Sequence, residues 1–195
     1  MSYAGPYGAY PPTSLAPVRP KKVLALCDPA GGNVLVLARA LANGLSRLQV
    51  AADVRPISDW DLEGLYGCQL LVVGTESRDF GHSEGARQFL ERMRDLDLLG
   101  RQGFVFDVRA SKLVIASIGA IVERRMKACK LELPFERECA SVGDCGSLEK
   151  GEEKRFEELG LEIAKKVWRT EDKARQARSV NIFLRLLHHQ AFHAA

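Results

Sequence analysis

Residues 22–48, KVLALCDPAGGNVLVLARALANGLSRL, join a short apolar run to an amphipathic segment through a turn of small residues. The apolar run at residues 23–26 has the length and composition of a strand that is buried on both faces. The turn Ala30-Gly31-Gly32-Asn33 leads directly into a segment whose apolar residues recur at helical spacing. A strand, a glycine-rich turn and a helix in this order present free N–H groups and the positive end of a helix dipole, which favour an anion. The stretch therefore predicts a buried strand, a helix and an anion-binding turn between them.

The rest of the chain alternates apolar runs with amphipathic segments. We expect strands at residues 22–27, 50–56, 69–74, 103–107 and 131–142, the last interrupted at Pro134. Longer helical patterns lie between and after these runs, and a helix of one or two turns, capped by Ser58 or Asp59, is expected at 58–67. Strands that alternate with helices predict a parallel α/β sheet with right-handed crossovers and helices on both faces.

Three loops are expected at the carboxyl ends of the strands, at residues 28–33, 75–83 and 108–112. Open parallel sheets bind ligands beyond this edge, where the strand order reverses. We therefore expect the three loops to converge on one crevice.

Four segments resemble the compact FMN-binding flavodoxins of archaea and bacteria, over residues 21 to about 168. The segments are CDPAGGNV at 27–34, GTESRDFG at 74–81 with Phe89-Leu90 after it, FVFDVR at 104–109 and GDCGSLEKGE at 143–152. The first keeps the Asp and the Gly-Asn of the family's Y-D-S-x-x-G-N-T pattern. The resemblance implies a flavodoxin-like, doubly wound sheet of five parallel strands in the order 2-1-3-4-5.

The resemblance also implies a non-covalent FMN site, with the phosphate on the first loop and the flavin ring between the other two. The cofactor contacts that it implies are Asp28, Ala30, Gly31, Gly32, Asn33, Val34, Thr75, Glu76, Ser77, Arg78, Asp79, Phe80, Gly81, Asp107 and Arg109. Pro29 and Val34 stand where family members supply hydroxyl groups. Losing two neutral hydrogen bonds costs about 1–3 kcal/mol, or about one to two decades of affinity.

The function that the resemblance implies is electron transfer between a reduced donor and a partner protein, with the flavin as the reacting group. An FMN-dependent NAD(P)H:quinone reductase is one alternative. A cofactor-free flavodoxin-like interaction module is another, because of Pro29, Val34 and the lone aromatic Phe80 in the second and third loops. A receiver domain shares the strand order but needs paired acids after the first strand and a lysine after the fifth. The sequence carries no Ser/His/Asp set, clustered Cys/His site or P-loop lysine.

Composition places the chain among globular proteins. It has 195 residues, 46% of them hydrophobic, and no apolar stretch near the roughly 20 residues that span a bilayer. The first 20 residues lack the charged start and apolar core of a secretory signal.

Five cysteines without a C-x-x-C pair predict a reduced, cytoplasmic protein whose cysteines are small core residues. Cys27 is the one cysteine whose position could make it reactive.

Two flanking segments are expected to lie outside the domain. Residues 1–20 contain five prolines and should form a disordered arm. Residues 169–195 read as a basic amphipathic helical extension whose apolar stripe is Val180, Phe183, Leu184 and Leu187. The stripe could contact a partner or a second copy in a homodimer, or fold back on its own domain. The histidines at 188, 189 and 193 are expected at the end of a surface helix and not in a metal site. Nucleic-acid binding is not expected, because the body of the chain has no clustered basic face.

Overall fold

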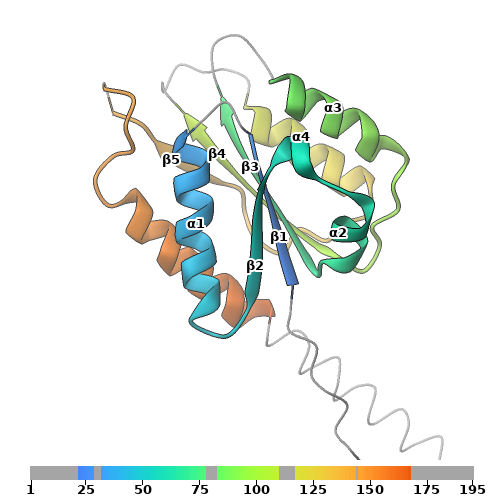
Figure 1. Cartoon of the computed structure of the whole chain (residues 1–195), viewed down its shortest axis with the longest axis horizontal. Coiled ribbons are helices and arrows are strands. Elements are labelled where there is room, and N and C mark those ends of the chain that lie inside the picture. Colours follow the sequence, from blue (N-terminus) through green and yellow to red (C-terminus); the bar gives the residue numbers. More distant parts are fainter. Residues whose placement is uncertain (1–21, 29–31, 78–82, 110–116, 144, 168–195) are drawn as a thin grey trace, which may run out of the picture.

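A computed structural model describes residues 22–28, 32–77, 83–109, 117–143 and 145–167. The strands are β1 (Lys22–Cys27), β2 (Ala51–Pro56), β3 (Leu70–Ser77), β4 (Gln102–Arg109) and β5 (Glu138–Ser141). They form one parallel sheet of five strands in the order β2-β1-β3-β4-β5 (Figure 1). The predicted doubly wound sheet and its strand order are confirmed. The flanking segments 1–20 and 169–195 lie outside the described residues.

Helices cover both faces of the sheet. α1 (Gly32–Ser46) and the helix at residues 152–167 share one hydrophobic core, and α2 (Leu62–Gly67), α3 (Glu84–Arg92) and α4 (Ile118–Ala128) share the other (Figure 1). Short 3-10 turns, η1 (Ile57–Asp59) and η2 (Met93–Asp95), follow β2 and α3. β1 sends Val23, Ala25 and Cys27 into the first core and Leu24 and Leu26 into the second. A strand covered on both faces needs apolar residues at every position, which explains its continuous apolar run.

The helical patterns expected after β3 and β5 form helices that each bury one apolar stripe. In α3 and η2 the buried residues are Ala86, Phe89, Leu90 and Met93. In the helix at 152–167 Phe156, Ile163 and Val167 are buried, and Leu159 packs against them. Helical periodicity located these faces because each helix buries one stripe against the sheet.

The strands near the site differ from the sequence prediction in length. β3 continues to Ser77 and β4 to Arg109, so residues expected in loops belong to the sheet. Their polar side chains face each other in register, Thr75 opposite Asp107 and Ser77 opposite Arg109. Polar residues can continue a buried strand when their side chains bond to one another.

Two other boundaries also needed correction. The fifth strand is shorter than predicted, since only a single bridge at Glu132 precedes β5. Pro134, which lacks an N–H donor, lies where the chain leaves the sheet. The short helix α2 is capped by Asp61, whose carboxylate accepts a hydrogen bond from Gly64 N at 2.5 Å, and not by Ser58 or Asp59. Those two residues lie in η1.

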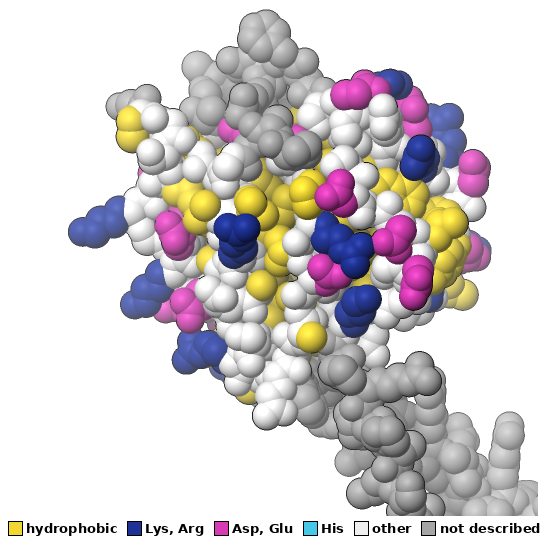
Figure 2. Space-filling model, viewed as in Figure 1, with side chains coloured by type: hydrophobic (Ala, Val, Ile, Leu, Met, Phe, Trp, Pro, Cys, Tyr) yellow, Lys and Arg dark blue, Asp and Glu magenta, His cyan; other side chains and the backbone are white. Residues whose placement is uncertain are grey.

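The surface is mixed in charge. Figure 2 shows acidic and basic side chains interspersed over the face in view, without a broad field of one sign. Among the described residues, no helix is long and apolar enough to cross a membrane.

α1 and the helix at residues 152–167 touch through their backbones at two glycines. A Cβ on Gly44 would lie 2.0 Å from the Glu157 carbonyl oxygen, and one on Gly160 would lie 2.2 Å from the Leu41 carbonyl oxygen. Backbone atoms of a packed helix cannot move aside as the end of a flexible side chain can. The two helices therefore reach their separation only because neither position carries a side chain.

We predict that Gly44→Ala lowers the free energy of unfolding by about 1–3 kcal/mol, because the added methyl overpacks a backbone contact. Urea unfolding followed by circular dichroism measures the change. Gly67→Ala is the matched control, because a Cβ there meets nothing within 4 Å and alanine favours a helix over glycine. Equal unfolding midpoints for the two variants would contradict the close packing.

Candidate functional site

Buried polar side chains gather at the carboxyl edge of the sheet. Within the described residues, the buried polar or charged side chains are those of Asp28, Thr75, Glu76, Ser77 and Asp107. Asp28 follows β1, and the other four lie at the ends of β3 and β4. Neighbouring parallel strands end at the same edge, so residues from distant parts of the sequence meet here. This edge is where a ligand-binding site is expected.

Asp107 is the centre of the hydrogen-bond network at this edge. Its side chain is completely buried. The Ser77 hydroxyl lies 2.8 and 2.7 Å from its two carboxylate oxygens, and the Ser117 hydroxyl donates to Oδ2 at 2.7 Å. The Thr75 hydroxyl adds a longer bond to Oδ1 at 3.2 Å, and Arg109 Nε lies 3.5 Å from Oδ2. Both oxygens act only as acceptors, and such charge-assisted bonds contribute about 1.5–3 kcal/mol each.

The same hydroxyls receive the first backbone amides of α4. Ile118 N donates to Ser77 Oγ at 3.1 Å, and Ala120 N donates to Ser117 Oγ at 3.3 Å. Each serine hydroxyl therefore accepts a hydrogen bond from the positive end of the α4 dipole and donates one to the buried carboxylate of Asp107. Hydrogen bonds linked in this way strengthen one another. The anion-binding capacity of α4 is used by a carboxylate of the chain itself.

α1 begins differently. Its first turn carries no acidic residue, and a Cβ on Gly32 would meet nothing within 4 Å. α2 and α3 both begin with a capping side chain and an acidic residue, Asp61 with Glu63 and Ser83 with Glu84. The start of α1 thus keeps the electrostatic character of an anion site.

Two side chains fix the start of α1 from opposite sides. Asn33 Nδ2 donates to the Gly146 carbonyl oxygen at 2.9 Å, which ties the helix to the turn after β5. Val34 is fully buried in the core under α1. A side chain at position 34 therefore packs against the sheet, and only its backbone could face a ligand.

The structure brings several of the residues predicted as cofactor contacts to one edge and leaves others untested. The described candidates are Asp28, Gly32, Asn33, Val34, Thr75, Glu76, Ser77, Asp107 and Arg109. Arg109 is half-buried at the end of β4, with 31% of its side chain exposed. Ala30, Gly31, Arg78, Asp79, Phe80 and Gly81 lie outside the described residues. Whether any of these residues contacts a cofactor stays a prediction.

Ser117 is a part of this network that sequence reasoning missed. α4 begins at Ile118, and Ser117 is its N-cap in an extended conformation. A serine before an apolar helical run is a recognisable cap signal. Its bond to Asp107 could not be read from the sequence, because that contact depends on how α4 crosses the sheet.

The cysteines fall into two groups. Cys27, Cys68 and Cys129 are buried, as predicted for core residues, whereas Cys139 and Cys145 are exposed. Burial raises the pKa of Cys27 to about 12, so we expect this thiol to be unreactive despite its place beside the first loop. Hydrogen bonds from the backbone and hydroxyl of Ser147 lower the pKa of Cys145. Cys145 therefore forms a thiolate more readily than the other cysteines.

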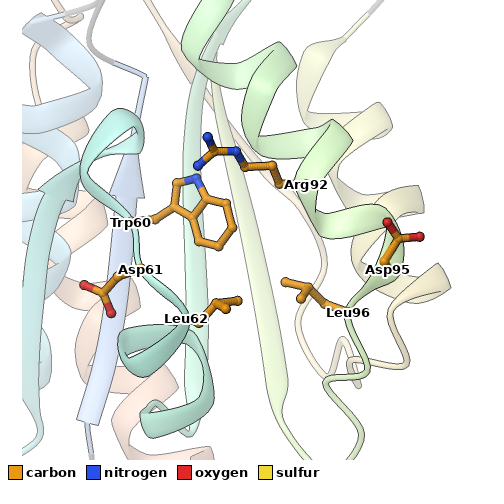
Figure 3. A pocket seen from close by; sticks show the side chains of 6 residues that line it. All are labelled: Trp60, Asp61, Leu62, Arg92, Asp95 and Leu96. Carbon is orange, nitrogen blue, oxygen red and sulfur yellow. The ribbon is translucent and has the colours of Figure 1, made fainter.

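A hollow of about 410 Å³ lies away from this edge, between α2 and the α3–η2 segment (Figure 3). Trp60, Leu62 and Leu96 point toward one another across it, and the Arg92 guanidinium lies 5.9 Å from the centre of the Trp60 ring. Trp60 also packs edge-on against Phe89. Sequence reasoning did not identify this groove, because its two walls come from segments about 30 residues apart.

Solved structures with the same architecture include flavodoxins and flavodiiron proteins. Flavodoxin 2 from Bacillus cereus aligns with a TM-score of 0.66 at 18% identity, covering 74% of this chain and 99% of that one. The chain has a flavodoxin-like fold. A flavodoxin from Streptococcus pneumoniae aligns with a TM-score of 0.62 at 20% identity, over 74% of this chain and 99% of that one. The flavodiiron protein from Giardia intestinalis gives a TM-score of 0.60 at 15% identity over 74% of this chain and 35% of its own length.

Because the sequence identities are low, the likeness to these solved structures establishes the flavodoxin-like fold alone. Comparisons of sequence add no further assignment, since no protein-family model and no curated protein sequence matches the chain. The fold that the four sequence segments implied is confirmed, and the ligand has to be argued from the site.

We predict that iodoacetamide at pH 7.5 alkylates Cys145 first in the folded protein, on the order of tenfold faster than Cys139. Thiolate is the reacting form, and partial desolvation raises the pKa of Cys139 although part of this residue is exposed. Peptide mass spectrometry over time measures both rates. Cys27, Cys68 and Cys129 should react only in urea. A Cys145→Ser variant should lose the fast phase, and rapid labelling of Cys27 in the native state would contradict the burial of β1.

Proposed function

We propose that this domain binds FMN non-covalently at the carboxyl edge of its sheet and carries electrons between a reduced donor and a partner protein. The observation that carries the proposal is the start of α1. It lies after β1, between β2 and β3, where the strand order reverses, and its first turn is free of acidic side chains. Ligands of doubly wound sheets bind at such switch points, and a phosphate group suits a helix start.

The described residues fit this cofactor. Gly32 leaves open space at the helix start, and the backbone N–H groups of Gly32, Asn33 and Val34 would hold the phosphate. Asp28 and Glu76 are acidic and buried nearby, but each interacts with other groups of the chain. The ends of β3 and β4 would support the ring, with Thr75, Glu76, Ser77 and Arg109 as the contacts proposed among the described residues. When bound, FMN would supply the one- or two-electron chemistry.

In this proposal the chain contributes binding, orientation and charge. The start of α1 would hold the phosphate, and the hydrogen bond from Asn33 to Gly146 keeps that start in place. Arg109 is the cationic group at the end of β4, next to the predicted ring site. The carrier is proposed to act in the cytoplasm, in keeping with its five free cysteines. Its redox partner would bind where the flavin edge is exposed.

The proposal is tested directly by adding FMN and then riboflavin to the purified chain and following the quenching of flavin fluorescence. Saturable FMN quenching, and release of FMN by acid, are the expected results. A chain that binds neither flavin would overturn the carrier and leave the cofactor-free interaction module. If FMN binds, NAD(P)H oxidation with a quinone as acceptor would instead identify a reductase.

Asn33→Asp should raise the Kd for FMN by about tenfold, because a carboxylate at the helix start repels the phosphate. The Kd for riboflavin, which has no phosphate, should stay within about twofold. Asn43→Asp near the other end of α1 is the matched control, since it adds the same charge at an exposed position far from the predicted phosphate. Equal weakening of both flavins by Asn33→Asp would point to a structural effect of the lost bond to Gly146.

Pro29→Ser should tighten FMN binding by about two- to tenfold, because it restores one hydroxyl donor to the first loop. Isothermal titration against FMN and riboflavin measures the gain, which should be absent for riboflavin. Val34→Thr is the contrasting variant. Its hydroxyl would replace a fully buried methyl in the core, so it should destabilise the fold without improving FMN affinity. Tighter FMN binding by Val34→Thr and not by Pro29→Ser would contradict this placement of the phosphate.

A further inference from the structure

The Asp107 carboxylate joins three segments that are far apart in the sequence. Ser77 ends β3, Asp107 lies near the end of β4, and Ser117 caps α4; the hydroxyl–carboxylate bonds span 30 and 10 residues. The side chain of Asp107 has no exposed surface. Its oxygens are turned toward hydroxyls of the chain, so its influence on a bound molecule has to pass through its neighbours.

Close packing of α4 supports the same junction. A Cβ on Gly119 would lie 3.2 Å from Asp107 Cβ and 3.3 Å from Ser117 Oγ. The absence of a side chain at this position lets the first turn of α4 approach the carboxylate. Within the described part of the chain, the start of α4 is therefore held to the sheet by both packing and hydrogen bonds.

An amide cannot replace this carboxylate without loss. Ser77 and Ser117 each direct a hydroxyl proton at Asp107 while accepting a backbone N–H from α4. An asparagine offers one acceptor oxygen and one donor NH₂ in place of two acceptor oxygens. One serine hydroxyl would then lose its acceptor inside a buried site, which is costly because water cannot replace it.

We propose that Asp107 is the positioning residue of the flavin site. It fixes the ends of β3 and β4 and the start of α4 as one unit, through Ser77 and Ser117, and it does so without touching the flavin. This role rests on the proposed function. It assigns to Asp107 an indirect contribution, whereas the sequence resemblance implied a direct cofactor contact.

The test combines two measurements on the full chain carrying Asp107→Asn. The first is the Kd for FMN, which should rise by at least about tenfold, since the ring support is no longer preorganised. The second is amide hydrogen exchange at Ile118 and Ala120, the donors to the two serine hydroxyls, which should accelerate by a similar factor. Ser117→Ala keeps the carboxylate and should shift both readouts in the same direction by less.

Leu98→Ala is the control for a loss of stability alone. Leu98 is buried in the same core as α4, in the segment that leads into the amino end of β4. At temperatures where all variants are folded, its Kd for FMN should match that of the wild type. Asp107→Asn with an unchanged Kd, or Leu98→Ala with an equal loss, overturns the positioning role alone. A wild-type chain that binds no FMN overturns the proposed function as well, and the exchange rates then still report whether Asp107 holds α4.

Discussion

Parallel pairing of β1 with β2 on one side and with β3 on the other is the constraint on which the carboxyl edge depends. The two pairings run over the same residues of β1, from Val23 to Cys27. After β1 the chain turns toward β2 through α1, and after β3 it turns toward β4 through α3 on the opposite face of the sheet, so the start of α1 lies where the strand order reverses. The apolar composition of residues 23–27 in β1 follows from the same arrangement, since neighbours on both sides and helices on both faces bury all five of these residues.

The first turns of α4 and α1, both at this edge of the sheet, have different surroundings. α4 places its first amides on Ser77 and Ser117, which pass that polarity to the buried Asp107. α1 has no acid in its first turn. A buried carboxylate is tolerated only when donors surround it, so the network around Asp107 solves a problem internal to the fold. By contrast, the start of α1 has the positive dipole end and no acidic side chain in its first turn, which suits it to an anionic ligand.

α1 is fixed in place by contacts with residues near the end of the described chain. At its first turn, Asn33 bonds to Gly146, a residue 113 positions later in the chain. Near its other end, Gly44 meets the backbone of Glu157 in the helix at residues 152–167. The direction in which α1 presents its amides is therefore set by residues that sequence distance would not connect with it. The geometry at the start of α1 therefore depends on contacts between segments that lie far apart in the sequence.

The sequence by itself determined the architecture, because its causes are local and periodic. Continuous apolar runs specified doubly buried strands, stripes at helical spacing specified the inner faces of α1 and α3, and four short segments pointed to the flavodoxin-like strand order. Strand ends were less predictable: Thr75, Ser77 and Arg109 look like loop residues until the register places Thr75 opposite Asp107 and Ser77 opposite Arg109. The tertiary structure alone decided that Val34 faces the core, that Cys27 is buried and Cys145 exposed, and that Ser117 reaches Asp107. Burial and hydrogen bonds across the sheet depend on where distant segments meet, and no local pattern contains that information.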